Sequence, residues 1–228
     1  MSAPRATLAR RTAAETLGTA FLLAAVVGSG IMGERLSGGT AGLALLANTI
    51  ATGASLVVLI LTFGPLSGAH FNPAVTLADA WQGGTQWRDV PAYVLAQLAG
   101  AIGGVLAAHL MFGESPFQIS EHARAGSAQG FSEFVATFGL LTVLWSCVRS
   151  EPRAVPFAVG LYITGAYWFT ASTSFANPAV TIARSLTNTF SGIRPADVPL
   201  FISSQLVGSF AATVFCRWLL PAPSLESQ

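Results

Sequence analysis

Asn72-Pro73-Ala74-Val75-Thr76 and its second copy, Asn177-Pro178-Ala179-Val180-Thr181, are the two stretches of sequence that decide the fold. Each copy has the signature of a helix start. An asparagine oxygen satisfies a free backbone N–H there, and proline at the first helical position loses no hydrogen bond. A helix N-terminus carries roughly half a positive charge. Two such ends that enter a membrane from opposite sides predict a pore rather than a catalytic cleft.

The composition is that of a membrane protein. Of the 228 residues, 52% are hydrophobic and 9% are charged, whereas a soluble domain averages about 25% charged residues. A net charge of +1 gives no reason to expect a nucleic-acid partner. Cys147 and Cys216 lie inside apolar runs and fit neither a disulfide framework nor a metal site. We therefore expect a partner in the lipid bilayer and neither a metal nor a cofactor.

Six apolar runs are candidates for crossing the bilayer, which takes about 20 residues. Two shorter helices begin at the Asn-Pro-Ala copies and are long enough to cover only about half of the hydrocarbon layer. The expected spans lie at about 12–33, 40–63, 90–112, 130–148, 154–169 and 198–220, and the short helices at 72–81 and 177–187. The sequence thus predicts an all-α membrane protein with two re-entrant half-helices.

The two halves of the chain repeat one another. Glu15 in the first span and Glu133 in the fourth each precede a threonine by four positions. Gln97-Leu98-Ala99-Gly100 in the third span matches Gln205-Leu206-Val207-Gly208 in the sixth. Each half holds three spans, so the second half must enter the membrane from the opposite side. This predicts a single channel domain over residues 1–228. Within it, residues of about 12–112 and about 130–220 form the two units of an inverted repeat.

The loops before the two short helices are expected to line the pore. Non-helical backbone at membrane depth survives only where it is buried in protein or faces a water-filled cavity. The midplane would present Asn72 and Asn177, whose amides donate to a permeating molecule, and the two helix ends would oppose cations and protons. The residues expected to contribute pore-lining backbone are Gly68, Ala69, His70, Phe71, Phe175 and Ala176.

Three ionisable residues have two interpretations each. Glu15 and Glu133 are predicted to accept backbone N–H groups of the re-entrant loops. The alternative is a proton-coupling acid in a secondary transporter. His70 is either a polar or pH-sensing group of the inner pore, or a packing residue whose carbonyl alone faces the pore. No acid pair and no nucleophile–histidine pair lies at depth, so the sequence gives no indication of an enzyme.

The paired motifs resemble those of the aquaporin/glycerol-facilitator family. The resemblance extends to the stretches 67–76, 14–19 and 96–100, and runs overall from about Ala13 to Leu219. It implies six tilted helices and two half-helices around a pore in each subunit. It also implies that the subunits form a homotetramer.

The sequence departs from the family pattern where selectivity is set. Most members have an arginine directly after the second Asn-Pro-Ala, and this chain has Val180. Arg184 is the nearest basic residue. It is expected about 6 Å further out, where it would at most make the mouth partly positive. The resemblance implies that Thr52, Ser174 and either Gly165 or Tyr167 complete the filter, which we expect to be wider than that of a strict water channel.

A filter without arginine resembles that of bacterial members associated with arsenic resistance. The implied substrates are small uncharged solutes: water, polyols such as glycerol, and the trivalent hydroxides arsenite and antimonite, including methylated arsenicals. Seven arginines fall in segments on the N-terminal side of the membrane and four on the other side. By the positive-inside rule, we expect the N-terminus to be cytoplasmic and the protein to lie in the inner (plasma) membrane.

Overall fold

The computed structural model describes residues 6–220, which form eight α-helices and no strand. Six helices are long, and two are the short helices that begin after Asn72 and Asn177. In chain order they are α1 (Leu8–Leu36), α2 (Ala41–Ser67), α3 (Pro73–Trp81), α4 (Val90–Phe112), α5 (Ser127–Ser150), α6 (Val155–Phe169), α7 (Pro178–Arg184) and α8 (Val198–Leu219).

Five of the long helices have the length and apolar composition of membrane spans: α1, α2, α4, α5 and α8. The sixth predicted span is present as α6, which has 15 residues and is shorter than the others. A 3-10 turn, Pro152–Ala154, precedes it. At its other end the chain leaves the helix at Thr170, whose backbone is extended. The re-entrant loop therefore follows a helix that is shorter than the other long helices.

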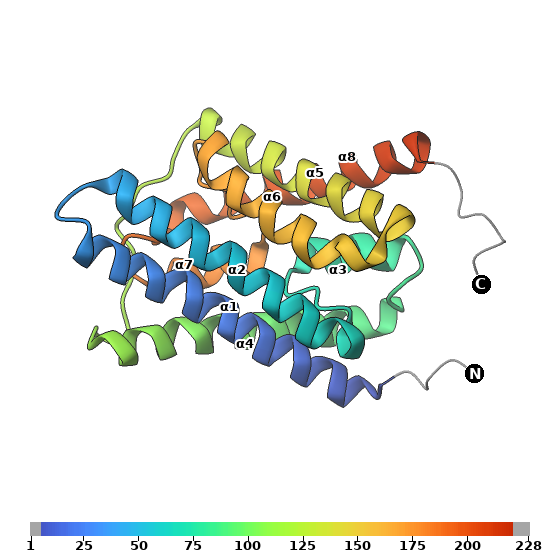
Figure 1. The fold of residues 1–228 in the computed structure, drawn as a ribbon, viewed down its shortest axis with the longest axis horizontal. Helices are drawn as coiled ribbons and strands as arrows, with labels where there is room; N and C mark the ends of the chain where they lie inside the picture. The colour runs from blue at the N-terminus through green and yellow to red at the C-terminus, as the bar shows by residue number, and fades with distance from the viewer. Residues whose placement is uncertain (1–5, 221–228) are drawn as a thin grey trace.

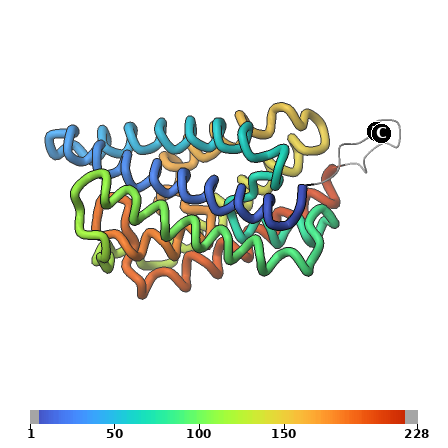
Figure 2. Tube along the Cα trace, turned by 90° about the horizontal axis from the view of Figure 1, so that it is seen from below, coloured from blue at the N-terminus to red at the C-terminus, as the bar shows by residue number. Residues whose placement is uncertain are grey.

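The two halves of the chain make matching contacts. α1 packs on α2 and α4, and in the same way α5 packs on α6 and α8. α3 contacts α8 of the other half, and α7 contacts α4. In Figure 1 the short helices α3 and α7 lie between the two sets of long helices, and Figure 2 shows α1 and α2 side by side along the molecule. This exchange of short helices is the inverted-repeat architecture predicted from the sequence.

Glycines let paired long helices approach closely at equivalent places in the two halves. A Cβ on Gly100 of α4 would lie 2.2 Å from the carbonyl oxygen of Thr16 in α1. A Cβ on Gly208 of α8 would lie 2.6 Å from the carbonyl oxygen of Phe134 in α5. In lipid, no hydrophobic driving force brings helices together. Small residues at such crossings instead allow close van der Waals packing between the helices. The closely packed pairs α1–α4 and α5–α8 form the scaffold between which the half-helices lie.

Both half-helices begin as their sequences predict. The side chain of Asn72 accepts from Ala74 N at 2.9 Å, and that of Asn177 accepts from Ala179 N at 3.0 Å, with proline as the next residue in each case. α3 ends at Trp81, as expected. α7 ends at Arg184, three residues before the predicted end, because the chain there tightens into bonds that span three residues.

Candidate functional site

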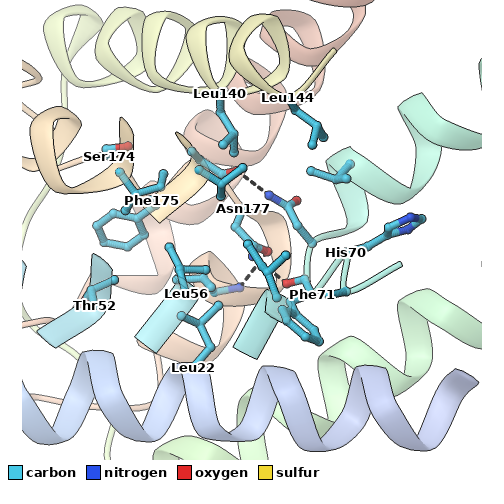
Figure 3. Close-up of a pocket in the computed structure, with 18 of the residues that line it drawn as sticks. Leu22, Thr52, Leu56, His70, Phe71, Leu140, Leu144, Ser174, Phe175 and Asn177 are labelled. Carbon is cyan, nitrogen blue, oxygen red and sulfur yellow. Dashed lines mark hydrogen bonds between the residues drawn. The ribbon is translucent and has the colours of Figure 1, made fainter. Parts of the chain in front are cut away.

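A cavity of about 270 Å³ contains both asparagines and parts of both re-entrant loops. In Figure 3, Thr52, Ser174 and Phe175 lie at one end of it, Asn177 near the middle and His70 at the other end. Opposite this polar strip is an apolar wall. Residues of α1, α2, α5 and α6 form this wall. Its residues include Leu22, Val26, Leu56, Ile60, Leu140, Leu144, Val159 and Ile163.

The two asparagines tie the loops together at the middle of the cavity. Asn72 Nδ2 donates to Ala176 O at 2.7 Å, and Asn177 Nδ2 donates to Phe71 O at 2.7 Å. A side-chain amide nitrogen carries two N–H groups. Each asparagine therefore keeps one donor for a molecule in the cavity, while its oxygen is held by the first turn of its own half-helix.

The loop backbone is strained in a way that recurs in both copies. Positive φ angles occur at Ala69 and Phe71 in the first loop and at Thr173, Ser174 and Ala176 in the second. Side chains other than glycine rarely adopt this region, and such residues gather at functional sites where the surroundings enforce them. Among residues 6–220, the carbonyl oxygens of Gly68, Ala69 and His70 accept no hydrogen bond, so they remain available to a solute.

Two fully buried glutamates enforce this loop geometry. Glu15 accepts from the backbone nitrogens of His70 at 3.0 Å and Phe71 at 2.7 Å. Glu133 accepts from those of Phe175 at 2.9 Å and Ala176 at 2.8 Å. Neither glutamate is among the residues that line the cavity. This is the geometry expected of loop support.

The glutamates are in turn held by the matched glutamines. Gln97 Nε2 donates to Glu15 at 2.8 Å, and Gln205 Nε2 donates to Glu133 at 2.6 Å. Each glutamine also donates to a threonine on a half-helix, Thr76 at 2.9 Å or Thr181 at 2.8 Å. In each half, the repeated Glu and Gln residues of the sequence thus belong to one hydrogen-bond network.

Four of the five candidate filter residues line the cavity: Thr52, Tyr167, Ser174 and Val180. Thr52 and Ser174 lie at the end that the expected orientation places outside, here called the outer end. The hydroxyl of Tyr167 donates to Thr52 Oγ1 at 3.4 Å. Gly165, the other candidate in α6, is exposed and does not line the cavity. Tyr167 is therefore the residue that α6 contributes to this end.

Arg184 also lines the cavity, although its position in the sequence placed it further out. Its guanidinium carbon lies 3.4 Å from the centroid of the Phe175 ring, and its Nε donates to Ser191 O. A second guanidinium, that of Arg124, lies 5.1 Å from the same centroid. No sequence signal pointed to Arg124, because it lies in the irregular segment between α4 and α5.

Arg124 is charged at neutral pH despite its burial. Desolvation lowers its pKa to about 10, well above pH 7. Burial also lowers the pKa of His122 in the same segment, and the charges of Arg124 and Arg184 add to that effect. The outer end of the cavity is thus a region of positive potential.

Comparison with known proteins agrees with this architecture. The profile of the family described as "Major intrinsic protein" matches residues 2–163. The chain is 60% identical over 213 residues to "Aquaglyceroporin AqpS" of Rhizobium meliloti (strain 1021), covering 93% of this chain and 91% of that protein. The chain belongs to the major intrinsic protein family.

More distant major intrinsic proteins share parts of the sequence or the fold. "Aquaporin NIP1-3" of Oryza sativa subsp. japonica is 39% identical over 157 residues, covering 68% of this chain and 54% of that protein. The X-ray structure of the aquaglyceroporin from Plasmodium falciparum superposes with a TM-score of 0.74 at 21% identity, covering 94% of this chain and 97% of that chain. The latter match shows the fold alone.

Aquaglyceroporins of the major intrinsic protein family are channels and not enzymes, so this chain is a passive multi-pass membrane channel for small solutes. Residues 6–220 contain no group of three or more His, Cys, Asp or Glu side chains that could hold a metal. The membership favours a channel over the proton-coupled transporter that the buried glutamates left open.

The inner end of this channel's cavity holds a histidine and an acid. His70 Nδ1 lies 3.1 Å from Thr76 Oγ1, and its Nε2 lies 3.6 Å from Asp79 Oδ2. Both His70 and Asp79 line the cavity. The side chain of His70 thus belongs to the inner pore together with its backbone. Asp79 was missed from the sequence, because its position in a short helix gave no sign of which way it faces.

Proposed function

We propose that this major intrinsic protein conducts small uncharged solutes, including polyols and the trivalent hydroxides arsenite and antimonite as well as water. Thr52, Tyr167, Ser174 and Val180 would form its outer filter. The observation that carries the proposal is Val180, which lines the cavity at the position where most members have an arginine. An aliphatic side chain there leaves room that a guanidinium would fill, and it donates no hydrogen bonds that would favour water alone.

The pore lining supports a substrate with several hydroxyl groups. One side of the cavity offers carbonyl oxygens and two asparagine donors, and the other side is apolar. A polyol or a trivalent hydroxide presents donors and acceptors to the first side and displaces little water from the second. The most similar protein reported above carries the name aquaglyceroporin, which agrees with this class of solute.

Stopped-flow measurements on proteoliposomes would test the proposed function. We expect glycerol and arsenite to equilibrate faster than in empty liposomes, without dependence on a pH difference across the membrane. A channel that passed water but excluded glycerol and arsenite would contradict the proposal. Flux that required a proton gradient would instead revive the transporter interpretation of Glu15 and Glu133.

We further propose that the protein is a homotetramer in the inner (plasma) membrane with its N-terminus in the cytoplasm. α1 begins and α8 ends at the same end of the molecule, as Figure 1 shows, which fits an even number of crossings. The arginine count supports this orientation. One of the seven arginines on the expected inner side, Arg5, lies outside the described residues.

A further inference from the structure

Two buried arginines, Arg184 in the cavity lining and Arg124 beside the same Phe175 ring, form no ion pair with a carboxylate among residues 6–220. Elsewhere in residues 6–220, Arg11, Arg35 and Arg194 form ion pairs at 2.8–2.9 Å. Arg184, only 2% exposed, makes a side-chain hydrogen bond through Nε alone, to Ser191 O. Its two terminal nitrogens have no protein acceptor in the described part of the chain, and the residue lines the cavity. A guanidinium fork is therefore left open to whatever occupies this space.

Arg124 adds a second positive charge that has no carboxylate in contact among the described residues. Its side chain donates only to neutral oxygens: Gly192 O at 2.8 Å, Ser172 O at 3.3 Å and Thr173 Oγ1 at 3.5 Å. Its guanidinium carbon and that of Arg184 lie 5.1 and 3.4 Å from one Phe175 centroid. Because both guanidinium carbons lie against one ring, they are also close to each other. Two positive charges so close together repel one another and favour an anion beside them.

The acids nearest this pair are already engaged. Asp197 accepts from Arg194 at 2.9 Å and from the backbone nitrogen of Arg124 at 2.8 Å. Both oxygens of Glu133 are held by loop nitrogens and Gln205. Burying an unpaired charge is costly. Glu133 attracts both guanidinium groups through space but forms no ion pair with either among residues 6–220, so the terminal nitrogens of Arg184 remain open to an acceptor in the cavity.

Ser174 provides an independent polar group in the same place. Its side chain is 2% exposed, it lines the cavity, and its Oγ has no hydrogen-bond partner among the described residues. Figure 3 shows it at the outer end, beside Phe175. Buried hydroxyls are nearly always hydrogen-bonded. Ser174 precedes Phe175, on whose ring Arg184 stacks, so the unpaired hydroxyl and the open guanidinium belong to the same part of the cavity lining.

We propose that the outer end of the cavity is a binding site for a small oxyanion, with Arg184 and Ser174 as direct donors and Arg124 as the second positive charge. The planar guanidinium fork matches two oxygens of a phosphate-like or carboxylate group. The site lies in the path of the solutes of the proposed function. An oxyanion bound from outside therefore blocks the channel reversibly, while uncharged solutes pass.

Thermal unfolding of the detergent-solubilised protein tests binding without relying on permeation. At matched ionic strength, phosphate in place of chloride should raise the unfolding temperature of the wild type by about 2–4 °C. Arg184→Gln should lose this shift, and Arg124→Gln should reduce it. Arg35→Gln is the matched control, because Arg35 is exposed and paired with Glu114, and it should keep the shift. An equal shift in Arg184→Gln and the wild type would mean a general salt effect and overturn the site.

Flux measurements then test whether the bound anion blocks the pore. External phosphate should slow glycerol flux saturably in wild-type proteoliposomes, and Arg184→Gln should need at least tenfold more phosphate. If Arg184→Gln does not fold, Arg124→Gln, which leaves the Arg184 fork in place, must show the weakened block. Phosphate-insensitive flux through the wild type would overturn the blocking role. Absence of any glycerol flux would contradict the proposed function, and the unfolding experiment would still decide the anion site.

Discussion

Val180 and Arg184 lie one helical turn apart, and together they reverse the usual arrangement of the outer pore. The resemblance to the wider family places an arginine at position 180, within the constriction itself. Here an aliphatic side chain occupies that position and the guanidinium approaches from the next turn, stacked on Phe175. Positive charge is thus kept near the mouth while the constriction remains free of a long side chain. In the proposed filter, size selection is assigned to Val180 and charge selection to Arg184.

Val180→Arg tests this separation. A second guanidinium within the filter should narrow the pore and lower glycerol and arsenite flux by about tenfold, equivalent to ~1.4 kcal/mol of barrier. Water is smaller, so its flux should fall much less. Stopped-flow light scattering measures both. Val180→Ala is the control, because it adds neither charge nor bulk and should lower neither flux. Equal losses of glycerol and water flux in a normally inserted Val180→Arg protein would rule out Val180 as a filter residue.

At the scale of helices, the crossings of α1 with α4 and of α5 with α8 depend on missing side chains. Gly100→Ala would place a Cβ 2.2 Å from a backbone oxygen, so α1 and α4 would have to separate. We expect a loss of about 1–3 kcal/mol in unfolding free energy, despite alanine's better helix propensity. Gly103→Ala in the same helix meets nothing within 4 Å and should be neutral or stabilising. Thermal unfolding of the two variants in one detergent makes the comparison; similar stabilities would show that the crossing tolerates a methyl group.

The helices and their caps could be predicted because their causes are local. Apolar length marks the spans, and Asn72-Pro73 and Asn177-Pro178 mark the half-helix starts within one residue. The predicted roles of Glu15 and Glu133 rested on a repeat visible in the sequence. Arg124 could not be placed in the same way. It reaches Phe175 only because an irregular segment folds back over α7, through bonds such as Ser120 N to Ser185 O at 2.9 Å. Such contacts leave no periodicity or motif spacing in the sequence from which they could be predicted.

Each half-helix of the molecule is held by both halves. Because α3 packs on α4 and α8, and α7 packs on α8 and α4, neither half encloses the cavity alone. In residues 6–220, the hydrogen bonds between the two loops come from Asn72 and Asn177, each of which donates to the opposite loop. The pore is therefore a property of the assembled pair, and its two ends differ in charge. The end expected to face outward has Arg184 in its lining with Arg124 nearby, whereas the end expected to face the cytoplasm has His70 beside Asp79.

Because the two ends of the cavity differ in charge, the orientation of the protein in the membrane decides from which side an anion would block the channel. If the N-terminus is cytoplasmic, the α1–α2 connection that contains Thr40 faces outward, and the α5–α6 connection that contains Arg153 faces the cytoplasm. Both residues are exposed. In a variant with Cys147 and Cys216 replaced by alanine, Thr40→Cys should react with a membrane-impermeant maleimide in intact cells. Arg153→Cys should react only after permeabilisation. The reverse pattern would place the two arginines of the cavity at its cytoplasmic end, and the anion block would then have to act from inside the cell.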